Sequence, residues 1–119
     1  MNRAIVLFGH GSRDPLWRLP METVATRLRH LQPGVPVRCA YLELDAPDLP
    51  TAAGELVAQG AQAITIVPMF LGTGRHARED LPVLVRGLEA RHPDITFKLQ
   101  KAVGEDGRVL DLLAKIALE

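Results

Sequence analysis

Residues 63–70 read Ala-Ile-Thr-Ile-Val-Pro-Met-Phe, and residues 71–76 continue with Leu-Gly-Thr-Gly-Arg-His. The first stretch is nearly all apolar and rich in β-branched side chains, which is typical of a strand buried on both faces. Pro68 has no N–H to donate to a neighbouring strand, so we place it near the end of that strand. The glycines that follow predict a loop. A strand of this kind favours a parallel sheet covered by helices.

The chain on both sides of this strand alternates short apolar runs with segments in which apolar residues recur at helical spacing. We predict strands over residues 4–8, 35–42, 63–70 and 95–99, and helices from near Pro20 to Leu31, Asp48 to about Gln59, Asp80 to about Arg91, and Glu105 to Leu118. The apolar stripe of the first helix is expected at Leu16, Val24, Leu28 and Leu31, and that of the last at Val109, Leu110, Leu113, Ile116 and Ala117. This βαβαβαβα order predicts one α/β domain over residues 1–119. Its fold is flavodoxin-like and doubly wound, with a four-stranded parallel sheet in the order 2-1-3-4 and helices on both faces.

Composition narrows the class of protein. The 119 residues are 47% hydrophobic and 24% charged, as in an ordinary folded domain, which argues against disorder. Fourteen basic residues balance fourteen acidic ones, so nucleic acid is not an expected partner. The single cysteine, Cys39, excludes a disulfide framework and a cysteine-built zinc site. The apolar run at residues 4–8 is too short for a signal peptide or a membrane span, so we predict a cytoplasmic protein without a membrane partner.

Candidate chemistry falls at the point where the strand order reverses, between the first and third strands, because ligands of such sheets bind there. The loop over residues 9–14 presents His10, and the loop over residues 72–80 presents His76. Glu43 follows the second strand. Two imidazoles and a carboxylate suit a divalent metal ion and also proton abstraction near neutral pH. The alternatives are a His10 that bonds a backbone carbonyl, and a solvated His76 and Glu43.

Polar groups beside the two histidines predict recognition of an anionic ligand. Arg13, Arg75 and Arg78 are candidates for binding carboxylates, with a solvated charged rim as the alternative. Ser12 and the N–H groups around Gly11 are candidate donors, because the next helix points its amino end at the crevice.

Several familiar motifs are missing from the sequence. The chain has no phosphate-loop signature, no complete dinucleotide loop and no Gly-x-Ser-x-Gly elbow. A flavodoxin-like flavin or nucleotide binder stays as a rival hypothesis. It is disfavoured because the first loop offers histidine and arginine in place of a phosphate cradle.

Four stretches together resemble a known family: Gly9-His10-Gly11-Ser12-Arg13-Asp14-Pro15, Tyr41-Leu42-Glu43-Leu44, Val67-Pro68-Met69-Phe70-Leu71 and Gly74-Arg75-His76-Ala77-Arg78-Glu79-Asp80-Leu81-Pro82. They are similar to the short form of the sirohydrochlorin cobaltochelatases, in order and over essentially the whole chain. The resemblance implies a class II chelatase fold that inserts Co²⁺, or else Fe²⁺ or Ni²⁺, into a tetrapyrrole in cobalamin or siroheme biosynthesis, without a nucleotide or other cofactor. It implies that His10 and His76 handle the metal and the pyrrole protons, that Glu43 assists, and that a homodimer closes the cleft.

The chain departs from that family pattern at residues 16–20, Leu-Trp-Arg-Leu-Pro, where relatives continue with polar residues into a regular helix. Trp17 is expected either to stack on a macrocycle or to pack at an interface. A divergent carrier that binds a tetrapyrrole or a metal without inserting it is the alternative function.

Overall fold

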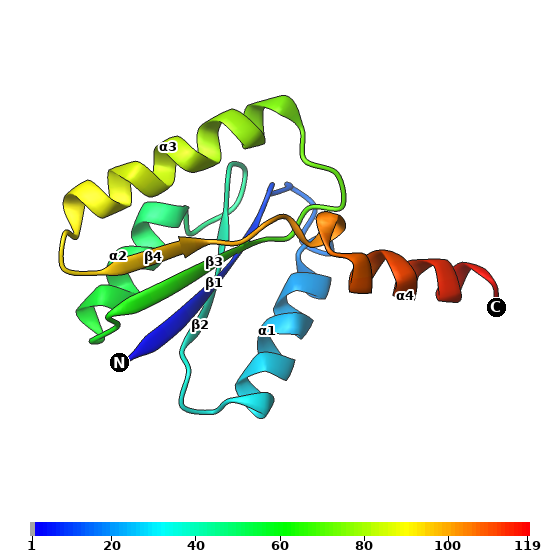
Figure 1. Cartoon of the computed structure of the whole chain (residues 1–119), viewed down its shortest axis with the longest axis horizontal. Helices are drawn as coiled ribbons and strands as arrows, with labels where there is room; N and C mark the ends of the chain where they lie inside the picture. The colour runs from blue at the N-terminus through cyan, green and yellow to red at the C-terminus, as the bar shows by residue number, and fades with distance from the viewer. Residues whose placement is uncertain (1) are drawn as a thin grey trace.

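The computed structural model describes residues 2–119 as a four-stranded sheet with helices on both faces (Figure 1). All strand pairs are parallel and the order is β2-β1-β3-β4, which confirms the predicted topology. Phe8 lies opposite Pro68, so β1 and β3 end side by side. The elements are β1 (Arg3–Gly9), α1 (Leu19–Leu31), β2 (Val37–Tyr41), α2 (Leu49–Ala58), β3 (Ala63–Pro68), α3 (Arg75–Arg91), β4 (Thr96–Leu99), the 3₁₀ turn η1 (Val103–Glu105) and α4 (Gly107–Ala117).

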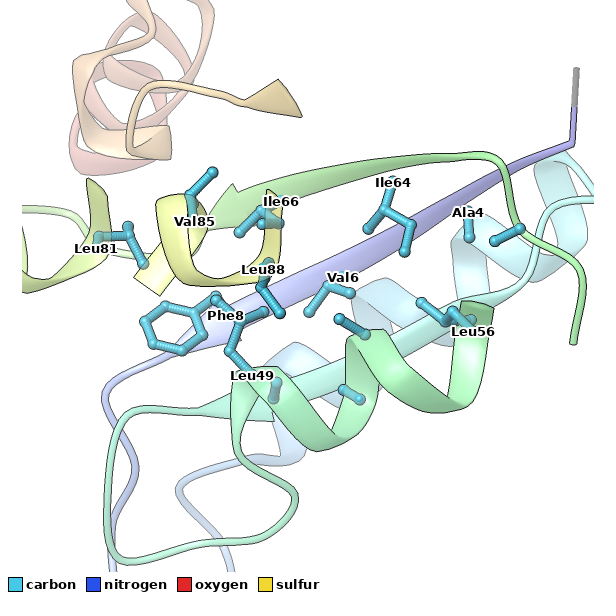
Figure 2. Packing of buried hydrophobic residues seen from close by; sticks show 14 of the residues in the cluster. Ala4, Val6, Phe8, Leu49, Leu56, Ile64, Ile66, Leu81, Val85 and Leu88 are labelled. Carbon is cyan, nitrogen blue, oxygen red and sulfur yellow. The ribbon is translucent and has the colours of Figure 1, made fainter. Parts of the chain in front are cut away.

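Most of the core lies between the sheet and the two helices α2 and α3 (Figure 2). Alternate residues of β1 point into it because side chains of a strand alternate between faces, and Phe8 packs edge-on against Phe70 with ring centroids 6.1 Å apart. A smaller core lies on the opposite face, where Met21 and Ala25 of α1 cover Leu7. Helices α2 and α3 therefore share one face of the sheet, and α1 covers part of the other.

Two of the predicted helix starts are confirmed. Helix α1 begins at Leu19 with Pro20 in its first turn, and α2 begins after Asp48, whose carboxylate accepts a hydrogen bond from the N–H of Thr51 at 2.9 Å. Pro20 and Pro50 lie in the first turns of α1 and α2, where an N–H group has no helical carbonyl to bond.

The predicted start of α3 at Asp80 is wrong, because the helix begins at Arg75 and Pro82 lies inside it. Pro82 has no N–H to bond the carbonyl of Arg78, which costs helix stability. Ala77 and Leu81 are buried against the core, and this packing stabilises the early turns in spite of the proline. As a consequence His76 lies in the first turn of a helix and not in a loop.

The predicted packing of the last helix is also wrong. Helix α4 starts at Gly107, after η1, and Figure 1 shows it extending away from the sheet. No residue of Gly107–Ala117 is buried. Leu110, Leu113 and Ile116, which were expected to face the core, are 47%, 41% and 55% exposed.

The stripe expected on α1 is only partly buried. Leu28 packs against the sheet, but Val24 and Leu31 are exposed, and Met21 and Ala25 take the buried positions. Among residues 2–119, no helix is long and apolar enough to cross a membrane.

Candidate functional site

The loops that follow β1 and β2 continue the pairing of their strands. The N–H of Leu42 donates to the carbonyl of Gly9 at 2.9 Å, and the N–H of Glu43 donates to the carbonyl of His10 at 3.1 Å. Gly11 has a φ of +101°, and a Cβ on it would lie 1.7 Å from the carbonyl oxygen of Glu43. Only glycine fits this approach, so the two loops hold His10 and Glu43 opposite each other.

His10 and Glu43 form an imidazole–carboxylate pair at the carboxyl edge of the sheet. The distance from His10 Nε2 to Glu43 Oε1 is 3.0 Å, and the two side chains are 55% and 56% exposed. An ionised carboxylate can only accept, so Nε2 carries the hydrogen in this contact and Nδ1 of the neutral ring keeps its lone pair. The pair therefore offers the free Nδ1 atom of His10, which can bind a metal ion or accept a proton. The imidazole contacts a carboxylate and not the backbone carbonyl considered as the alternative.

His76 lies on the same edge, since it follows β3, the neighbour of β1. It is exposed in the first turn of α3. Within residues 2–119, no group of three histidine, cysteine, aspartate or glutamate side chains is placed to hold one metal ion. The structure thus joins His10 to Glu43, and it does not show His76 completing a preformed three-ligand site.

The loop after β1 directs its N–H groups onto its own surroundings. The N–H of Ser12 donates to Asp45 Oδ2 at 3.3 Å, that of Asp14 donates to Ser12 Oγ at 3.1 Å, and that of Leu16 donates to Asp14 Oδ1 at 2.9 Å. Helix α1 begins only at Leu19. The predicted cradle of backbone donors is therefore not formed by these three groups, and the hydroxyl of Ser12 stays a predicted contact to substrate.

Asp45 and Arg18 were missed from the sequence. Arg18 Nη1 lies 3.3 Å from Asp45 Oδ1, and the Asp45 side chain is only 14% exposed. Arg18 also pairs with Glu22 at 3.0 Å. Asp45 so ties the loop after β1 and the start of α1 to the loop after β2. No spacing rule predicts a contact between residues 27 positions apart.

The three predicted carboxylate binders are all exposed on this edge or beside it. Arg75 Nε pairs with Glu79 Oε1 at 3.0 Å across one helical turn. Arg13 and Arg78 take part in none of the ion pairs found within residues 2–119. Their recognition of substrate stays a prediction, and Arg13 and Arg78 have the freer side chains for it.

Large apolar side chains are exposed at the edge that holds the His10–Glu43 pair, in the loops after β1, β2 and β3 and at the first residue of α1. We call them the apolar rim; they are Leu16, Trp17, Leu19, Leu44 and Leu71. Leu44 is 52% exposed and holds a φ of +64°, a conformation that is unusual for a bulky residue. Trp17 was singled out from the sequence as a candidate contact to a macrocycle, and Leu16 was placed on the predicted stripe of the first helix; the exposure of Leu19, Leu44 and Leu71 was not predicted.

Trp17 also touches the small core. Its ring centroid lies 6.1 Å from that of Tyr41, with the planes tilted by 59°. Burial raises the pKa of Tyr41 to about 12. The indole is 39% exposed, so part of its surface is accessible to a ligand.

Known proteins similar to this chain all point to one family. The CbiX family model matches residues 4–119. A crystal structure of a CbiX protein from Marinobacter aquaeolei VT8 superposes with a TM-score of 0.84 at 32% identity, covering 98% of this chain and 94% of that one. The sirohydrochlorin chelatase SirB of Bacillus subtilis subspecies spizizenii, in complex with cobalt, gives 0.77 at 29% identity, covering 99% of this chain and 50% of that one.

A curated relative, the sirohydrochlorin cobaltochelatase of Methanococcus aeolicus, is 34% identical over 72% of this chain. The chain spans 60% of the length of that relative and 94% of the length of the Methanocaldococcus jannaschii cobaltochelatase, to which it is 26% identical.

Proposed function

Because this chain belongs to the CbiX family, we propose that it is a chelatase that inserts a divalent metal ion into a sirohydrochlorin-type tetrapyrrole. The observation that carries the proposal is the exposed His10–Glu43 pair at 3.0 Å, set among the apolar rim. Co²⁺ is the first candidate and Fe²⁺ or Ni²⁺ the alternatives. Relatives named as cobaltochelatases and ferrochelatases support Co²⁺ and Fe²⁺, and imidazole and carboxylate ligands accept all three ions.

Insertion exchanges two pyrrole N–H protons for one M²⁺ ion, so the site must deliver a metal and take up protons. Glu43 holds Nε2–H of His10, which orients the ring and makes Nδ1 a better ligand and base. His76, on the α3 side of the same edge, supplies the second imidazole. The metal is a substrate that must leave the protein. Within residues 2–119 no three ligands are preformed around one point, and such a site suits a metal ion that is transferred better than one that is held permanently.

The apolar rim gives this edge a surface for a flat macrocycle. Trp17 lies in the loop after β1, Leu44 in the loop after β2 and Leu71 in the loop after β3, so all three belong to the same edge of the sheet. We infer that Arg13, Arg75, Arg78 and the hydroxyl of Ser12 bind the peripheral carboxylates of the ring. No nucleotide or resident cofactor takes part in the proposed reaction.

The pair is more than half exposed, so one copy of the chain leaves the reacting groups in water. Metal insertion needs a desolvated ion, and a second surface would supply the other side of the cleft. The SirB chain, of which this chain covers 50%, has room for a second half of similar size. We propose that a homodimer provides it here. The cytoplasmic location predicted from the sequence stays a prediction.

The test is anaerobic absorbance spectroscopy of the purified chain with sirohydrochlorin and Co²⁺, Fe²⁺ or Ni²⁺, against controls without protein. We expect a metal-dependent spectral change faster than the control. His10→Ala, Glu43→Gln and His76→Ala should each lower the rate by about 10²-fold or more, as for loss of a general base, while the exposed His30→Ala should not.

Binding is followed separately, by quenching of the single tryptophan, Trp17. Quenching without acceleration by any metal would replace the chelatase by a carrier. Full activity in both His10→Ala and His76→Ala would refute the assignment of the site, and a chain that neither binds nor reacts would refute the substrate.

A further inference from the structure

Asp45 is the most sheltered carboxylate among the ion pairs within residues 2–119. Its side chain is 14% exposed, whereas the other carboxylates of these pairs are 34–62% exposed. Both of its oxygens accept hydrogen bonds, Oδ2 from the N–H of Ser12 and Oδ1 from Arg18, each at 3.3 Å. A carboxylate that is largely removed from water needs such partners. Because the two donors lie at different points of the loop after β1, Asp45 holds that loop at two places.

The backbone around Asp45 forms a tight turn that positions Glu43. The N–H of Asp45 donates to the carbonyl of Glu43 at 2.8 Å, and Leu44 between them has a φ of +64°. This is a γ-turn of the rarer, strained kind. Such a conformation persists only where its surroundings hold it. The contacts of the Asp45 side chain supply that support, and the turn that they hold sets the direction of Glu43.

Oδ2 of Asp45 fastens the loop that carries His10. Its donor, Ser12, is two residues after His10, and the N–H of Glu43 donates to the carbonyl of His10 itself at 3.1 Å. The His10 loop is therefore bonded to the Glu43 loop both at His10 and beyond it. The imidazole and the carboxylate, 3.0 Å apart, are more than half exposed, so their contact depends on this register of the two loops more than on packing.

Oδ1 of Asp45 acts on Trp17. Its partner, Arg18, follows Trp17 directly in the chain. The indole lies close to the backbone beside His10, since a Cβ on Gly9 would be 3.1 Å from its Cη2 atom. The contact of Arg18 with Asp45 thus links the segment that carries the exposed indole to the loop that carries the carboxylate of the pair.

We propose that Asp45 is a positioning residue with two separable tasks. Through Oδ2 it keeps His10 in register with Glu43, which serves the rate of metal insertion. Through Oδ1 and Arg18 it keeps Trp17 in place beside the pair, which serves binding of the macrocycle. The effect on rate rests on the chelatase proposed above, whereas the effects on binding and on the two loops are measured without metal insertion.

The test compares Asp45→Ala with Arg18→Ala, because the first removes both contacts and the second removes only the contact to Oδ1. Quenching of Trp17 by sirohydrochlorin gives the dissociation constant, and insertion of Co²⁺ at saturating sirohydrochlorin gives kcat. We expect both variants to raise the dissociation constant about 3–10-fold, as for the loss of one aromatic contact. Only Asp45→Ala should also lower kcat, by about 10–100-fold, since a displacement of about 1 Å at reacting groups has effects of that size.

The double variant Arg18→Ala/Asp45→Ala tests whether Arg18 acts through Asp45. Its dissociation constant should equal that of Asp45→Ala alone, because the second substitution removes a contact that is already lost. Glu22→Ala is the control for the other partner of Arg18, an exposed pair at 3.0 Å, and should leave the dissociation constant unchanged. Effects of Arg18→Ala and Asp45→Ala that multiply in the double variant would overturn the role of Asp45 in placing Trp17.

Asp48→Ala is the matched control for stability. Asp48 lies three residues further along the same loop, but its carboxylate accepts from Thr51 of α2 and from neither donor of Asp45. Asp48→Ala should lower the midpoint of urea unfolding, as Asp45→Ala does, and leave kcat and the dissociation constant unchanged. A loss of kcat in Asp48→Ala equal to that in Asp45→Ala would show that both follow stability, which would overturn the positioning role.

Two further readouts need neither metal insertion nor a bound ligand. Hydrogen exchange of the Glu43 N–H, which donates to His10, should be faster in Asp45→Ala than in the wild type and unchanged in Arg18→Ala. The emission of Trp17 should shift to longer wavelength in both variants as the indole becomes more exposed. Asp45→Asn replaces Asp45→Ala if the latter does not fold, and it should change at least one of these readouts, because its single acceptor oxygen cannot replace two.

The outcomes separate this role from the proposed function. A wild type that inserts no metal would overturn the chelatase alone, with hydrogen exchange and Trp17 emission still deciding the two tasks of Asp45. Unchanged exchange together with unchanged kcat in Asp45→Ala would overturn the first task. Equal losses of kcat in Asp45→Ala and Arg18→Ala would overturn the separation of the two tasks.

Discussion

Gly11→Ala is expected to destabilise the fold and to separate His10 from Glu43. The new Cβ would lie 1.7 Å from the Glu43 carbonyl oxygen, on a residue whose φ is +101°. The positive φ costs about 1–2 kcal/mol for a residue with a Cβ. The overlap with backbone adds about 1–3 kcal/mol, as for an overpacked core. The free energy of unfolding should therefore fall by about 2–5 kcal/mol.

Gly60→Ala is the matched control. Gly60 has a nearly equal φ of +97°, but a Cβ there meets nothing within 4 Å. It should lose only the conformational part, about 1–2 kcal/mol. The difference between the two variants isolates the contact between the loops that carry His10 and Glu43.

Urea unfolding followed by circular dichroism measures both free energies. The rate of metal insertion is then measured without urea, at a temperature where both variants are folded. It should fall in Gly11→Ala and stay unchanged in Gly60→Ala, since only the first substitution displaces Glu43. Equal losses of stability and equal rates in the two variants would refute the argument that the close approach at Gly11 positions the pair.

Two further predictions concern titrating side chains. Tyr41 is the only tyrosine, so phenolate absorbance reports it directly: ionisation should be centred near pH 12 in the folded chain and near 10 in denaturant. Because the folded pKa is the higher one, stability should be complete below pH 10 and should fall as the pH rises toward 12; a folded midpoint near 10 would contradict the burial of Tyr41. Asp48→Ala should cost about 1 kcal/mol through loss of the cap on α2. The hydrogen bond from Thr51 lowers the pKa of Asp48. The loss in free energy of unfolding caused by Asp48→Ala should therefore be complete above the ordinary aspartate pKa and should shrink as the pH falls below it. A loss that does not depend on pH would show that the carboxylate is not its cause.

The sheet could be predicted because its signals are local. Continuous apolar runs predicted β1 and β3. The alternation of these runs with segments of helical spacing predicted a parallel sheet in the observed order, and with it the edge where β1 and β3 end. The same topology placed His10 and Glu43 at one edge, because loops after neighbouring strands meet there, but their direct contact was not predicted.

The errors arose where tertiary contacts outweigh local signals. Asp80 and Pro82 resemble a helix start, but burial of Ala77 and Leu81 extends α3 back to Arg75. The apolar stripe of α4 predicts burial, but no residue of this helix is buried against the sheet. The contact of Asp45 with Arg18 joins two loops through side chains and leaves no periodic trace in the sequence.

The hydrogen bonds of the loop after β1 also bear on whether this edge of the sheet can bind phosphate groups. In many α/β folds the turn between the first strand and the first helix binds phosphate through free N–H groups at the start of that helix. Here the N–H groups of Ser12 and Asp14 are already engaged, and the carboxylates of Asp14 and Asp45 stand in their place. Asp45 is paired with Arg18 at 3.3 Å, so the engaged N–H groups, and not a net negative charge, distinguish this turn from a phosphate-binding one. We therefore expect inorganic phosphate and nucleotides to bind weakly here, and larger ligands with anionic groups at their periphery to rely on arginine side chains in place of this turn.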